Sequence, residues 1–250
     1  MLFLLPPSES KRAGGGTLSI DQVALSFGAL NPAREAVLAA LEQLCADPVG
    51  AAKALKLGPK QASLIELNRN LRTAPTMPAL DRYTGTVYDA LHGGGLSSAA
   101  RARAKQSLLI QTALFGLIPA TDLIPDYRLS ANTALPGISL RQVWQESHDT
   151  VFRRLNQGLV VDLRSKSYVE LAPIPSDVPS VWIEVVQRSA GGQLRALNHF
   201  NKKSKGELIR AVLFAQQAPD SWSALTRIAK SAGFELLPAD SQGVAYLVIG

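Results

Sequence analysis

The sequence predicts a mixed α/β fold, with helices surrounding a mixed sheet, in a single domain over residues 1–250. Short apolar runs typical of buried strands alternate along the chain with segments of helical periodicity. The chain has 250 residues, of which 46% are hydrophobic, and this is enough to bury a full core. No segment repeats at a fixed period or has low complexity, so we expect one continuous body.

The first apolar run, Leu2 to Leu5, is stopped by Pro6-Pro7 and predicts a buried strand that leads into the loop "PPSESKRAGGG". This N-terminal run has no basic segment before it and is too short for a signal peptide or a membrane span. The single cysteine, Cys45, fits a reducing compartment. We therefore expect a cytoplasmic protein with no membrane association.

Helical patterns dominate from residue 31 to residue 72. "NPAREAVLAALEQLCA" begins with Asn31 as a cap and Pro32 at the first helical position, and Asp47-Pro48 and Gly58-Pro59 repeat this start signal. Further along, "SLLIQTALFGLI" is apolar enough to be central, and "SLRQVWQESHDTVFRRLNQ" predicts an amphipathic helix.

The C-terminal part predicts strands that alternate with helices. "GLVVDL" is typical of a buried strand, and "SVWIEVVQ" and "QLRALNHF" predict a hairpin with its turn at residues 190–192. Two helices, "NKKSKGELIRAVLFAQQ" and "SWSALTRIAKSAG", precede two closing strands, "FELLPA" and "AYLVIG".

The stretch "LKLGPKQA", residues 55–62, predicts a tight turn between two short helices. Gly58 permits a bend, and free amides at the start of the second helix could hold a phosphate, with Lys56 and Lys60 adding charge. The stretch resembles the hairpin of a helix-hairpin-helix DNA-binding element, which we expect within residues 47–72. Lys56 stands where that element has its first glycine, and an ordinary helix corner remains the alternative.

The formal net charge of +6 favours anionic partners and gathers in two segments. Residues 53–72 carry five basic residues against Glu66, and residues 188–210 carry six against Glu207. In the second segment, Lys202, Lys203 and Lys205 fall where a helix begins, which is unfavourable for cations unless an anion offsets them. A solvated lysine cluster is the alternative.

Six blocks in order resemble the YaaA family of peroxide stress-response proteins: "LPPSESK", "YTGTVYDAL", "ALFGLIPATDLIPDYRLS", "LRQVWQE", "VVDLRSKSYVEL" and "HFNKKSKGELIRAVL". The resemblance implies a compact barrel-like domain, a positively charged cleft, and binding to duplex or distorted DNA. By position it assigns DNA contacts to Lys11, Arg128, Lys202, Lys203 and Lys205. With the residues derived from the sequence, the expected DNA-binding set is Lys11, Lys56, Gly58, Lys60, Arg128, Lys202, Lys203, Lys205 and Arg210.

Other functions have less support. His92, His148 and His199 lie far apart in the sequence, so we expect no metal site, and no nucleotide-cofactor fingerprint follows a strand. An enzyme is the alternative to a binding protein, with Ser8, Glu9, Lys11 and Tyr127 as catalytic residues if the fold joins their two loops. We expect a monomer that binds DNA phosphates without a cofactor and without catalysis.

Overall fold

Strand β1 (Leu2–Leu5) lies in the middle of the main sheet of the computed structural model, which describes residues 1–155, 158–189, 192–196 and 200–249. All of its side chains are buried, as expected for a strand that is covered on both faces. Pro6 and Pro7 follow it directly, and proline cannot donate to a ladder. The predicted first strand is confirmed.

The sheet has eight strands and is mixed, as predicted. β1 pairs in parallel with β3 on one side and with β6 on the other, and β7 and β10 extend the parallel part. The order is β4-β3-β1-β6-β7-β10-β9, with β8 paired to β7 and with β4, β8 and β9 antiparallel to their neighbours. The end strands β4 and β9 do not pair, so the described residues form an open sheet and not the closed barrel that the resemblance implies.

The remaining strands of the main sheet are β3 (Leu108–Thr112), β4 (Gly116–Pro119), β6 (Val160–Asp162), β7 (Ser180–Arg188), β8 (Leu194–Ala196), β9 (Glu235–Leu237) and β10 (Val244–Ile249). A separate two-stranded sheet joins β2 (Met77–Pro78) to β5 (Leu123–Ile124). The predicted hairpin is confirmed by the antiparallel pairing of β7 with β8, although residues 190–191 of its turn lie outside the described part of the chain.

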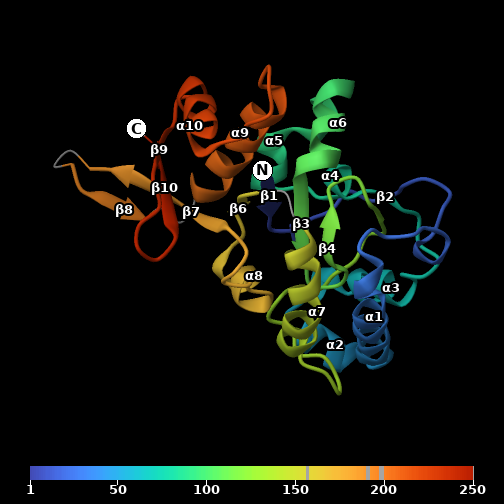
Figure 1. Ribbon diagram of the computed structural model, residues 1–250. Coiled ribbons are helices and arrows are strands. Elements are labelled where there is room, and N and C mark those ends of the chain that lie inside the picture. Colours follow the sequence, from blue (N-terminus) through green and yellow to red (C-terminus); the bar gives the residue numbers. More distant parts are fainter. Residues whose placement is uncertain (156–157, 190–191, 197–199, 250) are drawn as a thin grey trace.

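Helices surround this sheet, and Figure 1 shows α1, α2 and α3 at the opposite end of the molecule from α10 and β8. The α-helices are α1 (Asn31–Ala46), α2 (Pro48–Ala54), α3 (Ser63–Arg69), α4 (Ala79–Arg82), α5 (Thr86–Leu91), α6 (Ser98–Ser107), α7 (Leu140–Arg154), α8 (Lys166–Leu171), α9 (Phe200–Phe214) and α10 (Trp222–Ser231). Short 3-10 turns cover Ile20–Gln22, Gly28–Leu30, Pro59–Gln61 and Gly93–Gly95.

Two of the predicted helix starts can be compared with their geometry. The Asp47 side chain accepts a hydrogen bond from the amide of Val49 at 3.0 Å and caps α2, as predicted. Asn31 does not cap α1, because a 3-10 turn precedes it and it is already the first helical residue. Its side-chain oxygen instead accepts a hydrogen bond from the guanidinium of Arg34 at 2.9 Å.

Helix α9 packs closely against α5 at Gly206. A Cβ atom on Gly206 would lie 2.2 Å from the backbone oxygen of Val87 and 2.8 Å from the Cβ of Ala90. Only glycine permits this approach. The contact fixes the first turns of α9 relative to the start of α5, and both helix starts border the cavity described next.

Candidate functional site

A cavity of about 600 Å³ opens at the carboxyl ends of β1 and β6. These strands are parallel, so the loops that follow them, from Pro6 and from Leu163, reach the same edge of the sheet. The chain leaves β1 towards β3 on one side and later returns to β6 on the other. Open α/β sheets bind ligands where the strand order diverges in this way.

Side chains from four further segments complete the lining. They come from the α2–α3 turn, the start of α5, the loop before α7 and the first turns of α9. The charged lining residues among those described are Lys56, Lys202, Lys205 and Glu9. The two basic segments of the sequence therefore meet at one cavity, the first through Lys56 and the second through Lys202 and Lys205, although more than a hundred residues separate them in the sequence.

Lys205 is the lysine of this cavity that is held inside the protein. Its exposed fraction is 4%, and its Nζ donates one long hydrogen bond, 3.5 Å, to the backbone oxygen of Arg164. Burial lowers the pKa of Lys205 to about 8, against the opposing effect of Asp162 and Glu184. Its Nζ also lies 5.8 Å from the ring centroid of Trp182.

The other two lysines of the cluster at the start of α9 are both exposed. Lys202 lines the cavity, whereas Lys203 does not and forms an ion pair with Glu207 at 3.4 Å. The three lysines, which are adjacent in sequence, therefore differ in structure. Lys205 is buried, Lys202 is exposed at the cavity and Lys203 is exposed outside it.

A buried ion pair holds the loop after β6. Arg164 is fully buried, and its Nη2 donates to the carboxylate of Asp162 at 2.7 Å. Its Nη1 also donates to the backbone oxygens of Tyr168 and Ala172, at 3.1 and 2.7 Å. Sequence reasoning gave neither Asp162 nor Arg164 a role, although a strand that ends in Asp two residues before Arg was visible in "VVDLR".

The loop after β1 contacts the loop that carries Tyr127 and Arg128. The enzyme alternative requires that the fold bring these two loops together. Glu9 forms an ion pair with Arg128 at 2.8 Å, and the Lys11 Nζ lies 4.0 Å from the ring centroid of Tyr127. Tyr127 in turn shares a 2.7 Å hydrogen bond with the hydroxyl of Tyr83. Ser8 and Glu9 line the cavity, whereas Lys11 does not, although its Nζ donates to the backbone oxygen of Glu9 at 3.5 Å.

The surroundings of Lys11 destabilise the charged form of its amine. Burial is the main cause that lowers its pKa to about 7, and the positive charges of Arg128 and Arg82 act in the same direction. Asp126 and Glu9 oppose the shift. The pKa of Tyr127 is raised by burial, so its hydroxyl stays protonated at neutral pH.

The turn between α2 and α3 differs from the prediction in its backbone. Gly58 has φ −76°, which any residue can adopt, and the left-handed residue is Lys56 with φ +53°. The amide of Gly58 donates to the side chain of Gln61, and the amide of Gln61 donates back to the oxygen of Gly58. These two amides are already used within the turn, so they are not free to hold a phosphate. Lys56 lines the cavity and Lys60 does not.

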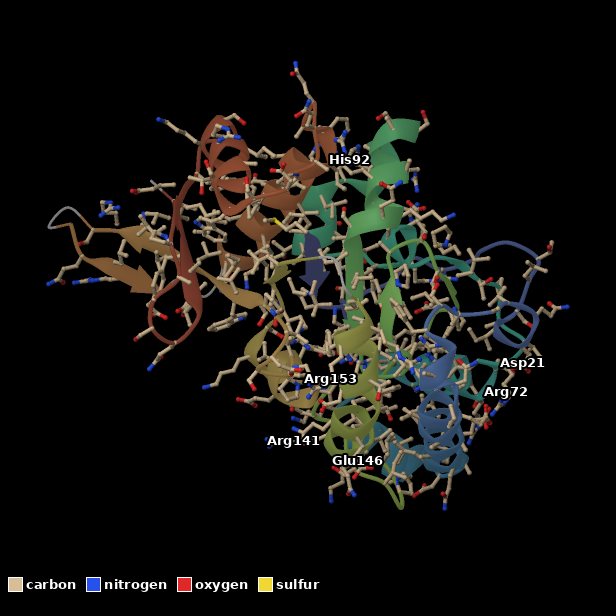
Figure 2. The ribbon with its side chains drawn as sticks, in the orientation of Figure 1. Asp21, Arg72, His92, Arg141, Glu146 and Arg153 are labelled. Atoms are coloured by element: carbon tan, nitrogen blue, oxygen red, sulfur yellow. The ribbon has the colours of Figure 1, made fainter. Side chains whose placement is uncertain are left out.

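Four arginines of the two basic segments, Arg69, Arg72, Arg188 and Arg210, have structural partners instead, and Arg188 forms an ion pair with Glu235 at 2.7 Å. Arg72 forms ion pairs with Asp21, Glu35 and Glu42, and Figure 2 shows Arg72 beside Asp21 at the edge of the molecule. Arg69 forms an ion pair with Glu66 and donates to the backbone oxygen of Cys45 at 2.7 Å.

Arg210 was expected to bind DNA, yet it lies outside the cavity lining. It donates to the backbone oxygen of Leu91 at 3.0 Å, at the end of α5, and its guanidinium lies 4.6 Å from the ring centroid of Phe214. These contacts join α9 to α5.

The described residues contain no group of three His, Cys, Asp or Glu side chains that could hold a metal ion; His199 lies outside them. His148 is buried and accepts a hydrogen bond from the amide of Leu117 at 3.0 Å. In the same part of the chain, no helix is both long and apolar enough to cross a membrane.

Comparison with known proteins identifies relatives along almost the whole chain. The family model described as "Peroxide stress protein YaaA" matches residues 1–239. A UPF0246 protein of Corynebacterium glutamicum is 40% identical over 238 residues, which cover 93% of each chain. A UPF0246 protein of Streptomyces coelicolor is 37% identical and covers 94% of this chain and 92% of its own. A UPF0246 protein of Shewanella loihica is 28% identical over 85% of each chain.

Proposed function

Because the chain belongs to the family of the peroxide stress protein YaaA, we propose that it acts in the peroxide stress response by binding duplex or distorted DNA. It does so as a cytoplasmic monomer, through the phosphates and without reading a base sequence. The residues that contact DNA are the lysines around the cavity, together with Lys60 on the adjoining turn and with Lys11 and Arg128, which both contact Glu9 of the lining.

The observation that most supports this proposal is that Lys56, Lys202 and Lys205 line the same cavity. The acidic residue in that lining, Glu9, forms its ion pair with Arg128 and so adds little negative potential. Lysine side chains gathered in this way attract phosphate oxygens irrespective of base sequence. The α2–turn–α3 unit then acts as a helix-hairpin-helix element whose lysines, rather than its amides, meet the DNA backbone.

A salt titration tests phosphate-led binding. Each phosphate that a lysine neutralises contributes about 0.9 to the slope of log K against log salt on duplex DNA. We expect the affinity for labelled duplexes of unrelated sequence to be equal and to fall steeply between low and moderate salt. A flat response to salt, or a strong preference for one sequence, would be inconsistent with this proposal.

A double variant tests the part played by the turn. Lys56→Ala with Lys60→Ala should lower the salt slope by about 2 and leave the melting temperature unchanged, because exposed lysines contribute little to folding. The matched control is Lys105→Ala with Lys230→Ala, which removes two exposed lysines outside the cavity lining. Equal binding by both double variants would show that the turn is only a helix corner.

The second candidate function is an enzyme that acts on a nucleotide, a damaged base or a phosphorylated small molecule. The observation that favours it is the surroundings of Lys11, whose amine has its pKa lowered to about 7 beside Tyr127. A neutral amine can act as a nucleophile or a general base at physiological pH. Ser8 and Glu9 would bind the substrate at the mouth. We place this function second, because Lys11 does not itself line the cavity.

A further inference from the structure

We propose that the cavity binds one nucleotide unit, with its phosphate at Lys202 and Lys205 and its sugar and base against the hydroxyl-bearing part of the cavity wall. The unit comes either from a free nucleotide or from an unpaired nucleotide of a DNA strand. This inference deepens the proposed function and rests on it only for the strand-borne source. Phosphate contacts along a duplex need only the protein surface, whereas this inference requires that a ligand enter the cavity.

The first argument is the state of Lys205. Its side chain is 96% buried and lines the cavity, and no carboxylate lies within ion-pair distance among the described residues. An ammonium group has three N–H donors, and the structure gives this one a single acceptor at 3.5 Å. Asp162 and Glu184 act on Lys205 only from beyond ion-pair distance, and Asp162 is already paired with Arg164. A buried charge without a close partner is costly, and a phosphate in the cavity would supply both charge and acceptors.

The second argument is size. A cavity of about 600 Å³ lies within the range of about 300–1,000 Å³ that is usual for small-molecule sites. A duplex with its bases stacked inside cannot enter such a space, because proteins that act on a base must first extrude it. A single nucleotide has the dimensions of a small-molecule ligand and can enter.

The third argument is the chemistry of the rest of the cavity wall. It carries hydroxyl groups from Ser130, Ser165, Ser167 and Tyr168 and an amide from Asn132. Hydroxyl and amide groups both donate and accept hydrogen bonds, as sugar hydroxyls and base edges require. The partly exposed ring of Tyr168 also offers an aromatic face, on which any base can stack. An inorganic phosphate would leave this wall unused.

The test compares three ligands by calorimetry at one salt concentration: deoxyadenosine 5′-monophosphate, a fully paired duplex, and the same duplex with one unpaired adenosine. We expect the free nucleotide to bind and the duplex with the unpaired nucleotide to bind about tenfold tighter than the paired one. Binding of the free nucleotide without this preference would support a free nucleotide as the source.

Two pairs of variants assign the binding to the cavity. Asn132→Trp fills the space from an exposed lining position, and Ala134→Trp is its control on the same loop outside the lining. Lys205→Met removes the buried charge but keeps the stem, and Lys203→Met is its control. The first member of each pair should weaken nucleotide binding about tenfold or more, and the controls should not.

The outcomes separate this inference from the proposed function. If the paired duplex binds but the free nucleotide does not, and the unpaired adenosine brings no gain, the inference is overturned and the proposed function stands. If none of the three ligands binds, both are overturned. If nucleotide binding survives in Asn132→Trp and in Lys205→Met, the nucleotide binds elsewhere and the inference is wrong.

Discussion

The turn between α2 and α3 and the first turns of α9 are alike in sequence and differ in structure. Each carries lysines beside a glycine, and both contribute to the same cavity, the turn through Lys56 and α9 through Lys202 and Lys205. In the turn, the lysines are exposed and a Cβ atom on the glycine would make an ordinary contact, 3.7 Å from the side-chain oxygen of Gln61. In α9, Lys205 is buried and Gly206 is in tight contact with α5. Substitutions in the turn should therefore affect binding with little effect on folding stability. Substitutions in the first turns of α9 should affect both binding and folding stability.

The largest expected effect comes from replacing Gly206 of α9 by alanine, compared with the same replacement of Gly58 in the turn. Gly206→Ala forces Cβ against the backbone oxygen of Val87 and should lower the free energy of unfolding by about 2–3 kcal/mol. In Gly58→Ala the new Cβ would lie 3.7 Å from its nearest neighbour, at a negative φ, and the change should stay within about 0.5 kcal/mol. Urea unfolding of both variants measures the difference, and equal losses would contradict the contrast between the two regions.

The next effect depends on pH and sharpens the contrast within α9. The pKa of Lys205 is lowered to about 8 in the folded protein, whereas lysine in an unfolded chain titrates near about 10.4. Between these values the unfolded chain binds the additional proton, so this group makes wild-type stability rise with pH. Lys205→Met removes a buried charge and should be more stable than wild type by about 1–3 kcal/mol at pH 7.

The advantage of Lys205→Met should shrink as the pH rises from about 8 to about 10, because the wild-type lysine then becomes neutral. The charged groups around Lys205, namely Asp162, Glu184 and Arg164, are the same in both proteins, so Lys205 is the charged group that differs. Lys202→Met, at an exposed position, is the control and should show no pH-dependent difference. A stability difference that is constant over this pH range would contradict the lowered pKa.

A smaller effect is expected at the left-handed residue of the turn. Lys56→Gly relieves a positive φ and should raise the free energy of unfolding by about 0.5–1 kcal/mol, even though it removes a charge. Lys60→Gly has no such strain to relieve and should lower it by a similar amount. Thermal and urea unfolding measure both variants. A loss of stability in Lys56→Gly would show that the lysine side chain, not the backbone, determines this turn.

The smallest expected effect on DNA binding is that of Lys11→Arg. Either cation can contact a phosphate, so the affinity for duplex DNA should change by no more than about twofold. We also expect wild type to release no base and cut no strand from DNA with oxidised bases or abasic sites. Borohydride trapping of a lysine adduct on abasic DNA, present in wild type and absent in Lys11→Arg, would favour the enzyme instead.

The sequence predicted the strands and most helices because local patterns determine them. The apolar run Leu2–Leu5 can only be buried, and Asp47 before Pro48 is a strong start signal. Asn31 was assigned wrongly as a cap because the 3-10 turn before it has no clear signature. The open sheet also departs from the barrel implied by resemblance, since strand order is set by tertiary contacts.

Site residues were harder to predict, because the sequence does not show which charged side chains already have an ion-pair or hydrogen-bond partner in the folded protein. Arg72 belongs to a basic segment, yet carboxylates of Glu35 and Glu42 on α1 neutralise it. Arg210 is occupied by backbone oxygens at the end of α5. The sequence alone could not predict the contact of Lys11 with Tyr127, because more than a hundred residues separate them.

The central place of β1 has a consequence for how the chain is made. β1 is first in sequence, but its partners are β3 and β6, which end at residues 112 and 162. A ribosome adds about 5–20 residues each second, so many seconds pass between the synthesis of the apolar segment "LFLL" and that of β6, the second strand that pairs with it. During that time it is an unpaired strand able to associate with other nascent chains. We infer that the growing chain is most prone to aggregate before residue 162 leaves the ribosome, and that this risk is highest at high expression rates.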